Sequence, residues 1–199
     1  MICKNEEALI GRMLESVKGA DQIVVLDTGS NDKTCEIARK YTSEVYENEF
    51  VWNNSFCDAR NAVKAKMKTD WIISVDCDEY VHDFSKVKEV IQVADQAVRV
   101  FMHQEGRGNN DNFKVPRLFK NTPDIRWEGN IHNHLTISGE GEPIGDVHIT
   151  YGYSPAHEAD PDRSLNMLLK EVQDPTKSRE CYYLGIELWK KKRFHEAVM

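Results

Sequence analysis

The chain has 199 residues, 40% of them hydrophobic and 30% charged, a composition typical of one globular domain, alone or with a short appendage. This mixture excludes a disordered chain and a repetitive fibre. The 26 basic and 33 acidic side chains leave a net charge of −7, which argues against a protein that binds duplex nucleic acid mainly through its phosphates.

Short apolar runs alternate with amphipathic stretches in the first two-thirds of the chain. This alternation predicts an α/β fold in which helices flank a mainly parallel sheet. We predict helices over residues 5–18, around Ile37–Tyr41, and over 56–68 and 84–93. We predict strands over residues 22–27, 44–48, 71–75 and 97–103. The runs at 22–27 and 71–75 are continuously apolar, which is typical of strands buried on both faces.

The last third of the chain does not continue this alternation of apolar runs and amphipathic stretches. Residues 105–112 carry no apolar anchor and predict a mobile loop, and residues 113–149 predict short strands and turns. Two helices are expected over 162–173 and 179–192, with a third beginning as the chain stops. We therefore divide the chain into a main domain, residues 1–160, and C-terminal helices, residues 161–199.

The C-terminal helices resemble part of a repeat. Leu184, Gly185, Phe194 and Ala197 match the spacing of the first part of a tetratricopeptide repeat. Because half a repeat cannot bury its own apolar face, we expect it to pack on the main domain or to form a homodimer contact. The alternative is that the chain is a trimmed piece of a longer protein, since the start at Met1–Cys3 is similarly abrupt.

The sequence also predicts a compartment. No apolar run approaches the roughly 20 residues of a membrane-spanning helix, and the first residues hold no stretch long enough for a signal peptide. The five cysteines are scattered and include no Cys-x-x-Cys pair, which predicts free thiols in a reducing environment. We expect a cytoplasmic protein with no membrane span.

Acidic residues follow the predicted strand at 71–75 directly, as Asp76-Cys77-Asp78-Glu79. Side chains at i and i+2 of an extended segment point to the same side, so Asp76 and Asp78 offer two carboxylates to one place. That place is the carboxyl end of a strand, where open α/β sheets bind ligands. Two hard oxygen ligands suit Mn²⁺ or Mg²⁺, which complete their shells with phosphates and water. The alternative is a pair of solvated carboxylates.

A second loop follows the predicted strand at 22–27. The strand carries Asp27 to the edge of the sheet, and Thr28-Gly29-Ser30 allows the backbone to approach a ligand closely. A plain connection between strand and helix is the alternative for this loop.

Four motifs in this order resemble family 2 glycosyltransferases, most strongly the bacterial subgroup that includes lipopolysaccharide-core glucosyltransferases and peptide S-glycosyltransferases. They are Lys4-Asn5-Glu6-Glu7, the run from Val25 to Thr34, Ala59-Arg60-Asn61, and the run from Asp70 to Glu79. The resemblance covers about residues 2–175 and implies a GT-A fold. It also implies metal-dependent transfer of a sugar, with inversion, from a nucleotide diphosphate sugar, expected to be a UDP-sugar, to a glycan, peptide or other acceptor.

The resemblance also implies roles for single residues. Asn5, Glu6 and Asp27, with Thr28 beside them, would line the pocket for base and ribose. Asp76 would lie near ribose and metal, Asp78 would bind the metal, and Arg60 would hold a phosphate or orient an aspartate. His148, which precedes Gly152-Tyr153, would be a further metal ligand, and Trp127 would contact the acceptor, together with residues 105–112 and 151–157. Each of these residues also has a structural alternative. His148 could be a packed strand histidine, Arg60 could form a surface ion pair, and Trp127 could be a core tryptophan.

The chain departs from the family's pattern at the expected base. The subgroup often has Gly-x-x-His-Glu where this chain has Gly129-Asn130-Ile131-His132-Asn133, and an amide cannot accept a proton usefully at neutral pH. We expect His132, ahead of Glu128 and His134, to act as the base, because a histidine is poised near neutral pH. Alternatively, the acceptor is acidic enough to need little help, or catalysis is weak. A zinc site at His132 and His134 lacks a third soft ligand.

The sequence is also compatible with other functions. The acceptor could be a modified base in phage DNA, which would require Lys64, Lys66, Lys68, Lys114, Arg117 and Lys120 to line one groove. Asn133 would also suit an inactive module that binds a nucleotide sugar. A nucleotidyltransferase is a more distant reading, because the Gly-rich, lysine-bearing first loop expected of one is missing.

Overall fold

The computed structural model describes residues 1–105, 113–137, 144–152, 154, 160–173 and 177–197. The first three strands are β1 (Ile2–Cys3), β2 (Val25–Asp27) and β3 (Val45–Tyr46), and they form a parallel sheet in the order β1-β2-β3. Their helices are α1 (Ile10–Ser16), α2 (Thr34–Ala38) and α3 (Phe56–Lys64).

Strand β2 is buried on both faces, as its continuous apolar run predicts. Val25 packs with Met13 and Leu14 of α1, whereas Val24 and Leu26 pack with Val63 of α3. Alternate side chains of a strand point to opposite faces, so the two helices cover the two sides of the sheet. The chain then runs from the carboxyl end of β2 through residues 28–33 into α2.

A second sheet has five strands in the order β4-β7-β6-β10-β5. The strands are β4 (Trp71–Ile73), β5 (Glu79–Val81), β6 (Ala97–Gln104), β7 (Phe113–Lys120) and β10 (Ile144–Tyr151). The pair β6–β10 is parallel, whereas β4–β7, β6–β7 and β5–β10 are antiparallel. We predicted one mainly parallel sheet, and the parallel pairs are found in the first sheet and in β6–β10 of the second.

Three more elements complete the main domain. Helix α4 (Phe84–Val90) packs on the second sheet through Val87, which joins the core with Val98 and Val147. Strands β8 (Trp127–Glu128) and β9 (His134–Leu135) form a short antiparallel ribbon beside α3. The predicted mobile loop, except for Glu105, lies outside the described residues.

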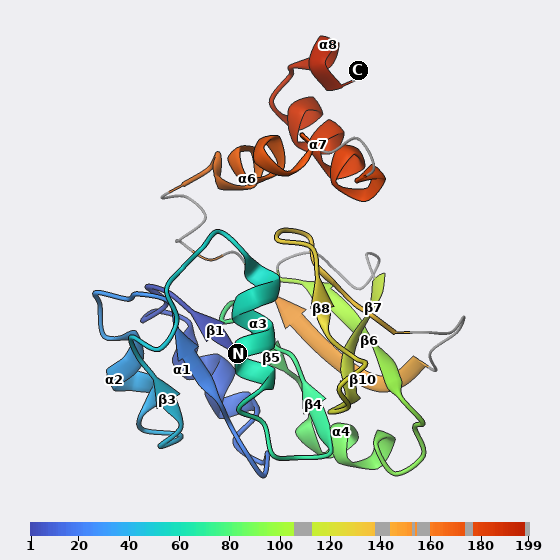
Figure 1. The fold of residues 1–199 in the computed structure, drawn as a ribbon. Coiled ribbons are helices and arrows are strands. Elements are labelled where there is room, and N and C mark those ends of the chain that lie inside the picture. Colours follow the sequence, from blue (N-terminus) through green and yellow to red (C-terminus); the bar gives the residue numbers. More distant parts are fainter. Residues whose placement is uncertain (106–112, 138–143, 153, 155–159, 174–176, 198–199) are drawn as a thin grey trace.

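The C-terminal helices are α6 (Arg163–Glu171), α7 (Ser178–Lys190) and α8 (Phe194–Ala197), and they lie together at one end of the molecule (Figure 1). They pack on the main domain, because Met167 and Leu168 of α6 share a buried cluster with Ile131 and Phe56. No helix in the described parts of the chain is long and apolar enough to cross a membrane.

Most elements have the predicted type and are shorter than predicted. The helix expected over 5–18 begins at Ile10, because residues 5–7 bond to the loop after β2 instead of entering the helix. Strand β5 was not predicted. It is only three residues long and follows the acidic motif directly, so its apolar pattern is too short to recognise.

Candidate active site

Two of the sequence motifs are hydrogen-bonded to each other at the carboxyl ends of β1 and β2. The backbone N–H of Asn5 donates to Ser30 Oγ at 2.9 Å, and Asn5 Oδ1 accepts from the N–H of Asn31 at 2.9 Å. The N–H of Glu6 donates to Thr34 Oγ1 at 2.7 Å. Asn5 has a φ of +55°, a conformation that asparagine tolerates better than most residues. The two motifs therefore form one wall of the site.

Asp27 holds the loop that follows it. Its carboxylate is buried and accepts from the N–H groups of Gly29 and Ser30 at 3.0 Å, and from Ser30 Oγ at 2.5 Å. Thr28 Oγ1 donates to the carbonyl of Cys3, which ties the same loop to β1. Both predicted binding residues thus shape the loop, and Gly29, with a φ of +112°, makes its turn possible.

Glu6 faces the acidic motif across the site. Its Oε1 accepts from Ser154 Oγ at 2.7 Å, whereas its Oε2 is buried and has no hydrogen-bond partner among the described residues. Burial raises the pKa of the Glu6 carboxyl, and the charges of Asp78 and Asp32 add to the effect, against the hydrogen bond from Ser154. Glu6 Oε2 is therefore a buried oxygen that can accept a hydrogen bond, or donate one when the carboxyl group is protonated.

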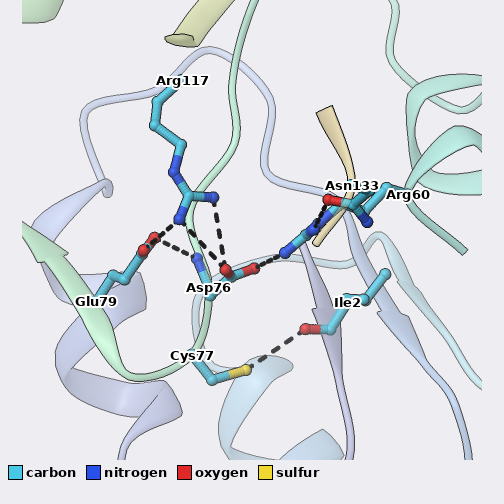
Figure 2. Close-up of polar contacts among 7 residues, drawn as sticks. All are labelled: Ile2, Arg60, Asp76, Cys77, Glu79, Arg117 and Asn133. Atoms are coloured by element: carbon cyan, nitrogen blue, oxygen red, sulfur yellow. Dashed lines mark hydrogen bonds and ion pairs between the residues drawn. The ribbon is translucent and has the colours of Figure 1, made fainter. Parts of the chain in front are cut away.

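Asp76 is the centre of a charged cluster (Figure 2). Its Oδ1 accepts from Arg60 of α3 at 2.6 Å, and its Oδ2 lies 3.4 Å from Arg117 of β7. Arg117 also pairs with Glu79 at 2.5 Å, and Glu79 Oε2 accepts from the N–H of Asp76 at 2.8 Å. Arg60 reaches Asn133 as well, with 2.5 Å between Nη1 and Oδ1. Two arginines and two carboxylates thus balance one another.

The environment of this cluster shifts the pKa values of its two carboxyl groups in opposite directions. Burial alone would raise the pKa of Asp76, but Arg60 and Arg117 hold that pKa well below its usual range, so Asp76 stays ionised. Burial, together with the negative charge of Asp76, raises the pKa of Glu79 to about 7 despite Arg117. Glu79 is therefore the group in this cluster that exchanges a proton near neutral pH.

The sequence did not predict Arg117 as a site residue. Strand β7 pairs with β4 so that Leu118 faces Ile73, and the N–H of Ser74 donates to the carbonyl of Arg117 at 2.8 Å. That register carries Arg117 to Asp76, although 41 residues separate them in the chain. One signal was present, because an arginine between apolar neighbours in a strand is expected to need a partner when it is buried.

Asp78 lies half-buried between β4 and β5, two residues beyond Asp76. Its carbonyl accepts from the N–H of Gly152 at 2.8 Å. A Cβ at position 152 would lie 2.7 Å from Glu105 Oε2, the end of a flexible side chain, and 3.4 Å from that carbonyl, so only the Glu105 carboxylate would have to shift. The hydrogen bond from Gly152 therefore joins the end of β10 to the acidic motif.

His148 is not beside the aspartates. It lies on β10 with its Nδ1 2.7 Å from His103 Nε2 and its Nε2 3.1 Å from Asp146 Oδ1. The carbonyl of His148 accepts from the N–H of His82, four residues along the ladder from the Gly152–Asp78 bond, which is on the order of 13 Å at the usual strand rise. In the described arrangement His148 is therefore a strand histidine among other histidines.

Trp127 is a core residue. It is 7% exposed and packs edge-on against Phe119, with the Arg60 guanidinium 5.0 Å above its ring centroid. Asn61 fixes β8 in place, because its side-chain amide exchanges two 2.9 Å hydrogen bonds with the backbone of Trp127. The ring thus supports Arg60 and does not present a free face for stacking on an acceptor.

None of the three candidate bases contacts Asp76 in the described part of the chain. The His132 ring stacks on Tyr183 of α7 with centroids 4.2 Å apart, and burial lowers the pKa of that imidazole. Glu128 Oε1 pairs with Arg126 at 2.5 Å in an exposed contact, and His134 is exposed opposite Glu128. Asn133 alone from this segment reaches the cluster. Its Nδ2 is buried without a partner in the described part of the chain.

The donors present suit a hard divalent cation better than a soft one. No three His, Cys, Asp or Glu side chains of the described residues lie close enough together to hold a metal ion by themselves. Asp76 is already paired with two arginines, whereas Asp78 and Glu6 bring carboxylates to the same end of the sheets. Mg²⁺ and Mn²⁺ take one or two carboxylates and complete their shells with substrate phosphates, so this set fits them.

Comparison with known proteins begins with a family model. Residues 1–150 match the model described as glycosyl transferase family 2. A TPR repeat-containing protein of Synechococcus elongatus is 31% identical over 136 residues, which are 66% of this chain and 33% of that protein. The SPbeta prophage-derived glycosyltransferase SunS of Bacillus subtilis is 24% identical over 212 residues, 100% of this chain and 50% of SunS. The chain thus spans half or less of these relatives.

Solved structures share the fold. Staphylococcus aureus TarS 1–349, crystallised in complex with UDP-GlcNAc, aligns with a TM-score of 0.56 at 14% identity over 94% of this chain and 70% of that one. The same protein in complex with UDP aligns at 0.55 and 16% identity, over 94% of this chain and 69% of that one. These likenesses confirm the α/β fold of GT-A type that the motifs predict.

Proposed function

Because the chain belongs to glycosyl transferase family 2, we propose that it transfers a sugar from a UDP-sugar to an acceptor, with inversion at the anomeric carbon. The observation that carries this proposal is the cluster at Asp76. Arg60 of α3 and Arg117 of β7 meet Asp76 there, and Cys77 beside it contacts the carbonyl of Ile2 in β1. This is the edge at which open α/β sheets bind their ligands.

A divalent cation, Mn²⁺ or Mg²⁺, is part of the proposal. When bound, it would supply Lewis-acid stabilisation of the negative charge that develops on a leaving diphosphate. Asp78 would hold it, and Oε2 of Glu6, which has no hydrogen-bond partner among the residues that the structure describes, would be a second oxygen nearby. This assignment leaves Asp76 to the arginines and does not use His148, unlike the expectation drawn from the motifs.

The chain's own residues would bind and orient the donor. Arg60 and Arg117 hold Asp76 ionised and in one orientation, so its carboxylate is preorganised beside the donor site. The joined loops at Asn5 and Ser30 would supply the wall for base and ribose. Both carboxylate oxygens of Asp27 accept hydrogen bonds from the loop that follows it. We therefore propose that Asp27 positions this wall and does not itself bind the nucleotide.

We propose Glu128 ahead of His132 as the base for the acceptor. An exposed ion pair contributes on the order of 0–1 kcal/mol, so Glu128 can leave Arg126 at little cost. His132 would have to leave a buried stack on Tyr183. The alternative acceptor, a modified base in DNA, loses support, because three of the six basic residues that it needs, Lys66, Lys68 and Arg117, are paired with carboxylates.

Calorimetric titration of UDP, followed by GDP, CMP and dTDP, with and without Mn²⁺, tests the proposal. We expect UDP to bind with Mn²⁺ and binding to be lost in Asp78→Ala. Asp21→Ala is the matched control, since Asp21 has an 85% exposed side chain near Lys88 and should bind UDP as the wild type does. No binding of any nucleotide by the wild-type chain would overturn the donor site. Binding without sugar release from UDP-sugars would favour the inactive module.

A further inference from the structure

Helix α6 brings an arginine to the candidate active site. Arg163 is the first residue of this helix, which lies over the start of α3, where its Leu168 shares a hydrophobic cluster with Phe56 (Figure 1). The Arg163 guanidinium lies 5.3 Å from the centroid of the Phe56 ring. Phe56 comes four residues before Arg60, so the two side chains share one face of α3, one helical turn apart. Arg163 thus reaches the face of α3 that carries Arg60 to Asp76.

Glu6 provides a second link between Arg163 and the site. Burial raises the pKa of the Glu6 carboxyl, and the positive charge of Arg163 acts in the opposite direction. Ser154, which precedes α6 in the chain, donates a hydrogen bond to Glu6 Oε1 at 2.7 Å. The start of α6 therefore lies near the carboxylate end of the site as well as near α3.

The charge of Arg163 is not balanced by a direct contact. Arg60 and Arg117 both pair with Asp76, and Arg12 of α1 also pairs with a carboxylate. Arg163 makes no hydrogen bond and no ion pair with any residue that the structure describes. Of its nitrogens only Nε is buried without a partner, and the two terminal nitrogens of this half-buried side chain are open to solvent.

A guanidinium with two open terminal nitrogens fits a phosphate group. Its planar fork can donate two parallel, charge-assisted hydrogen bonds to two phosphate oxygens. The ring of Phe56 beside it favours one placement of the cation. The carboxylates of Glu6 and Asp78 nearby would repel a bare anion, so a diphosphate that carries a divalent cation suits this place better than a free anion.

We infer that Arg163 binds the diphosphate of the sugar nucleotide, so that α6 completes the donor site of the proposed transferase. This assignment rests on the proposed function for the identity of the ligand. The family model matches residues 1–150 and does not reach α6, so none of the family's motifs includes Arg163. The C-terminal helices would then take part in donor binding as well as in packing.

Calorimetric titration of UDP with Mn²⁺ on the whole chain tests this role. Arg163→Met keeps an unbranched stem beside Phe56 and removes the charge, so we expect UDP to bind about 10- to 100-fold more weakly. Arg163→Lys restores the charge without the fork and should recover part of the binding. Urea denaturation verifies the fold of each variant, and Arg163→Gln replaces Arg163→Met should the latter unfold.

Arg193→Ala is the matched control. It removes an arginine from the same C-terminal part of the chain, where the side chain is 41% exposed and pairs with Glu196. We expect Arg193→Ala to bind UDP as the wild type does, because Arg193 has its own carboxylate partner in an exposed contact.

The possible results separate the role of Arg163 from the proposed function. UDP binding that is unchanged in Arg163→Met overturns the role and leaves the donor site standing. An equal loss in Arg163→Met and Arg163→Lys also overturns it, because the charge would then not be what binds. If the wild type binds no UDP, the proposed donor is wrong, and inorganic pyrophosphate with Mn²⁺ becomes the probe. Pyrophosphate binding that Arg163→Met weakens would support an anion site at α6, and its absence would overturn that site too.

Discussion

At the scale of single residues, the balance of charge around Asp76 explains why the cluster is stable without a ligand. Two guanidinium groups and two carboxyl groups meet there, and each side chain has at least one partner of opposite sign. Removing one member of such a buried set would leave an uncompensated charge. The site is therefore sensitive to substitution at Arg117, a residue that no motif marks.

Glu79 gives the cluster a pH dependence. Its folded pKa, about 7, lies above the ordinary value of 4.5, so the folded chain binds more protons than the unfolded chain between these values. The free energy of unfolding should therefore fall as the pH rises through that window. In Glu79→Gln the part of this fall that Glu79 causes should disappear, and the part that comes from the raised pKa of Glu6 should remain. Urea denaturation at a series of pH values will measure the difference.

The control for that series is Glu89→Gln, an exposed substitution that should leave the wild-type slope intact. Asp76 does not interfere, because its lowered pKa places its own contribution below about pH 4. Identical slopes for the wild type and Glu79→Gln would show that Glu79 keeps an ordinary pKa.

The two candidate bases differ in how they are held, and a pair of substitutions separates them. His132→Phe keeps a ring against Tyr183, so we expect the fold and turnover within a few-fold of the wild type. Glu128→Gln keeps the shape and removes the basic group, and we expect a loss of about 10² to 10⁴ in turnover. The opposite result, with an intact fold in both variants, would make His132 the base.

At the scale of elements, the contact of α4 with the second sheet depends on Gly145 of β10. A Cβ there would lie 2.6 Å from Val98 Cγ1 and 2.9 Å from Val90 Cγ1, and branched side chains cannot rotate away easily. We expect Gly145→Ala to lower the free energy of unfolding by about 1–3 kcal/mol.

Gly11 is the matched control for Gly145. It lies inside α1, and its added Cβ would meet only Ile37 Cγ2 at 3.6 Å. Gly11→Ala should therefore stabilise the chain by about 0.5–1 kcal/mol, because alanine loses less backbone entropy in a helix. If urea denaturation gave both variants the same sign, the close packing at Gly145 would not be real.

At the scale of the whole molecule, the C-terminal helices and the main domain share a buried cluster. Leu168 is fully buried in it, whereas Leu169 beside it is 40% exposed. We expect the chain to unfold in one transition. Leu168→Ala should lower the free energy of unfolding by about 2–5 kcal/mol, and Leu169→Ala should change that free energy by less than about 0.5 kcal/mol. A separate early transition of the helices would contradict this coupling and would favour the division at residue 160.

The exposed aromatic residues of α7 and α8 bear on association. Tyr182 and Trp189 are each 66% exposed, and Phe194 is 51% exposed with its ring 6.5 Å from Trp189. A homodimer through these helices stays a prediction, which sedimentation of the wild type and Trp189→Ser would test.

Local patterns in the sequence were enough to predict the types of most elements, and they also predict a position for the candidate site. The apolar runs at 22–27 and 71–75 predict strands buried on both faces, because a strand covered by helices has no polar side. Acidic and small residues directly after those runs predict a ligand site, since neighbouring strands end at one edge. These features depend on residues close together in the chain, and the structure confirms the strands.

The tertiary structure alone decided the partners. Arg117 reaches Asp76 because β7 pairs with β4 in one register, His148 joins His103 because β10 lies beside β6, and His132 stacks on Tyr183 because α7 packs on the turn after β8. Such contacts join segments far apart in sequence, and their register depends on the packing of whole elements. For that reason the motifs predict where the site lies, and only the tertiary structure determines which side chains meet there.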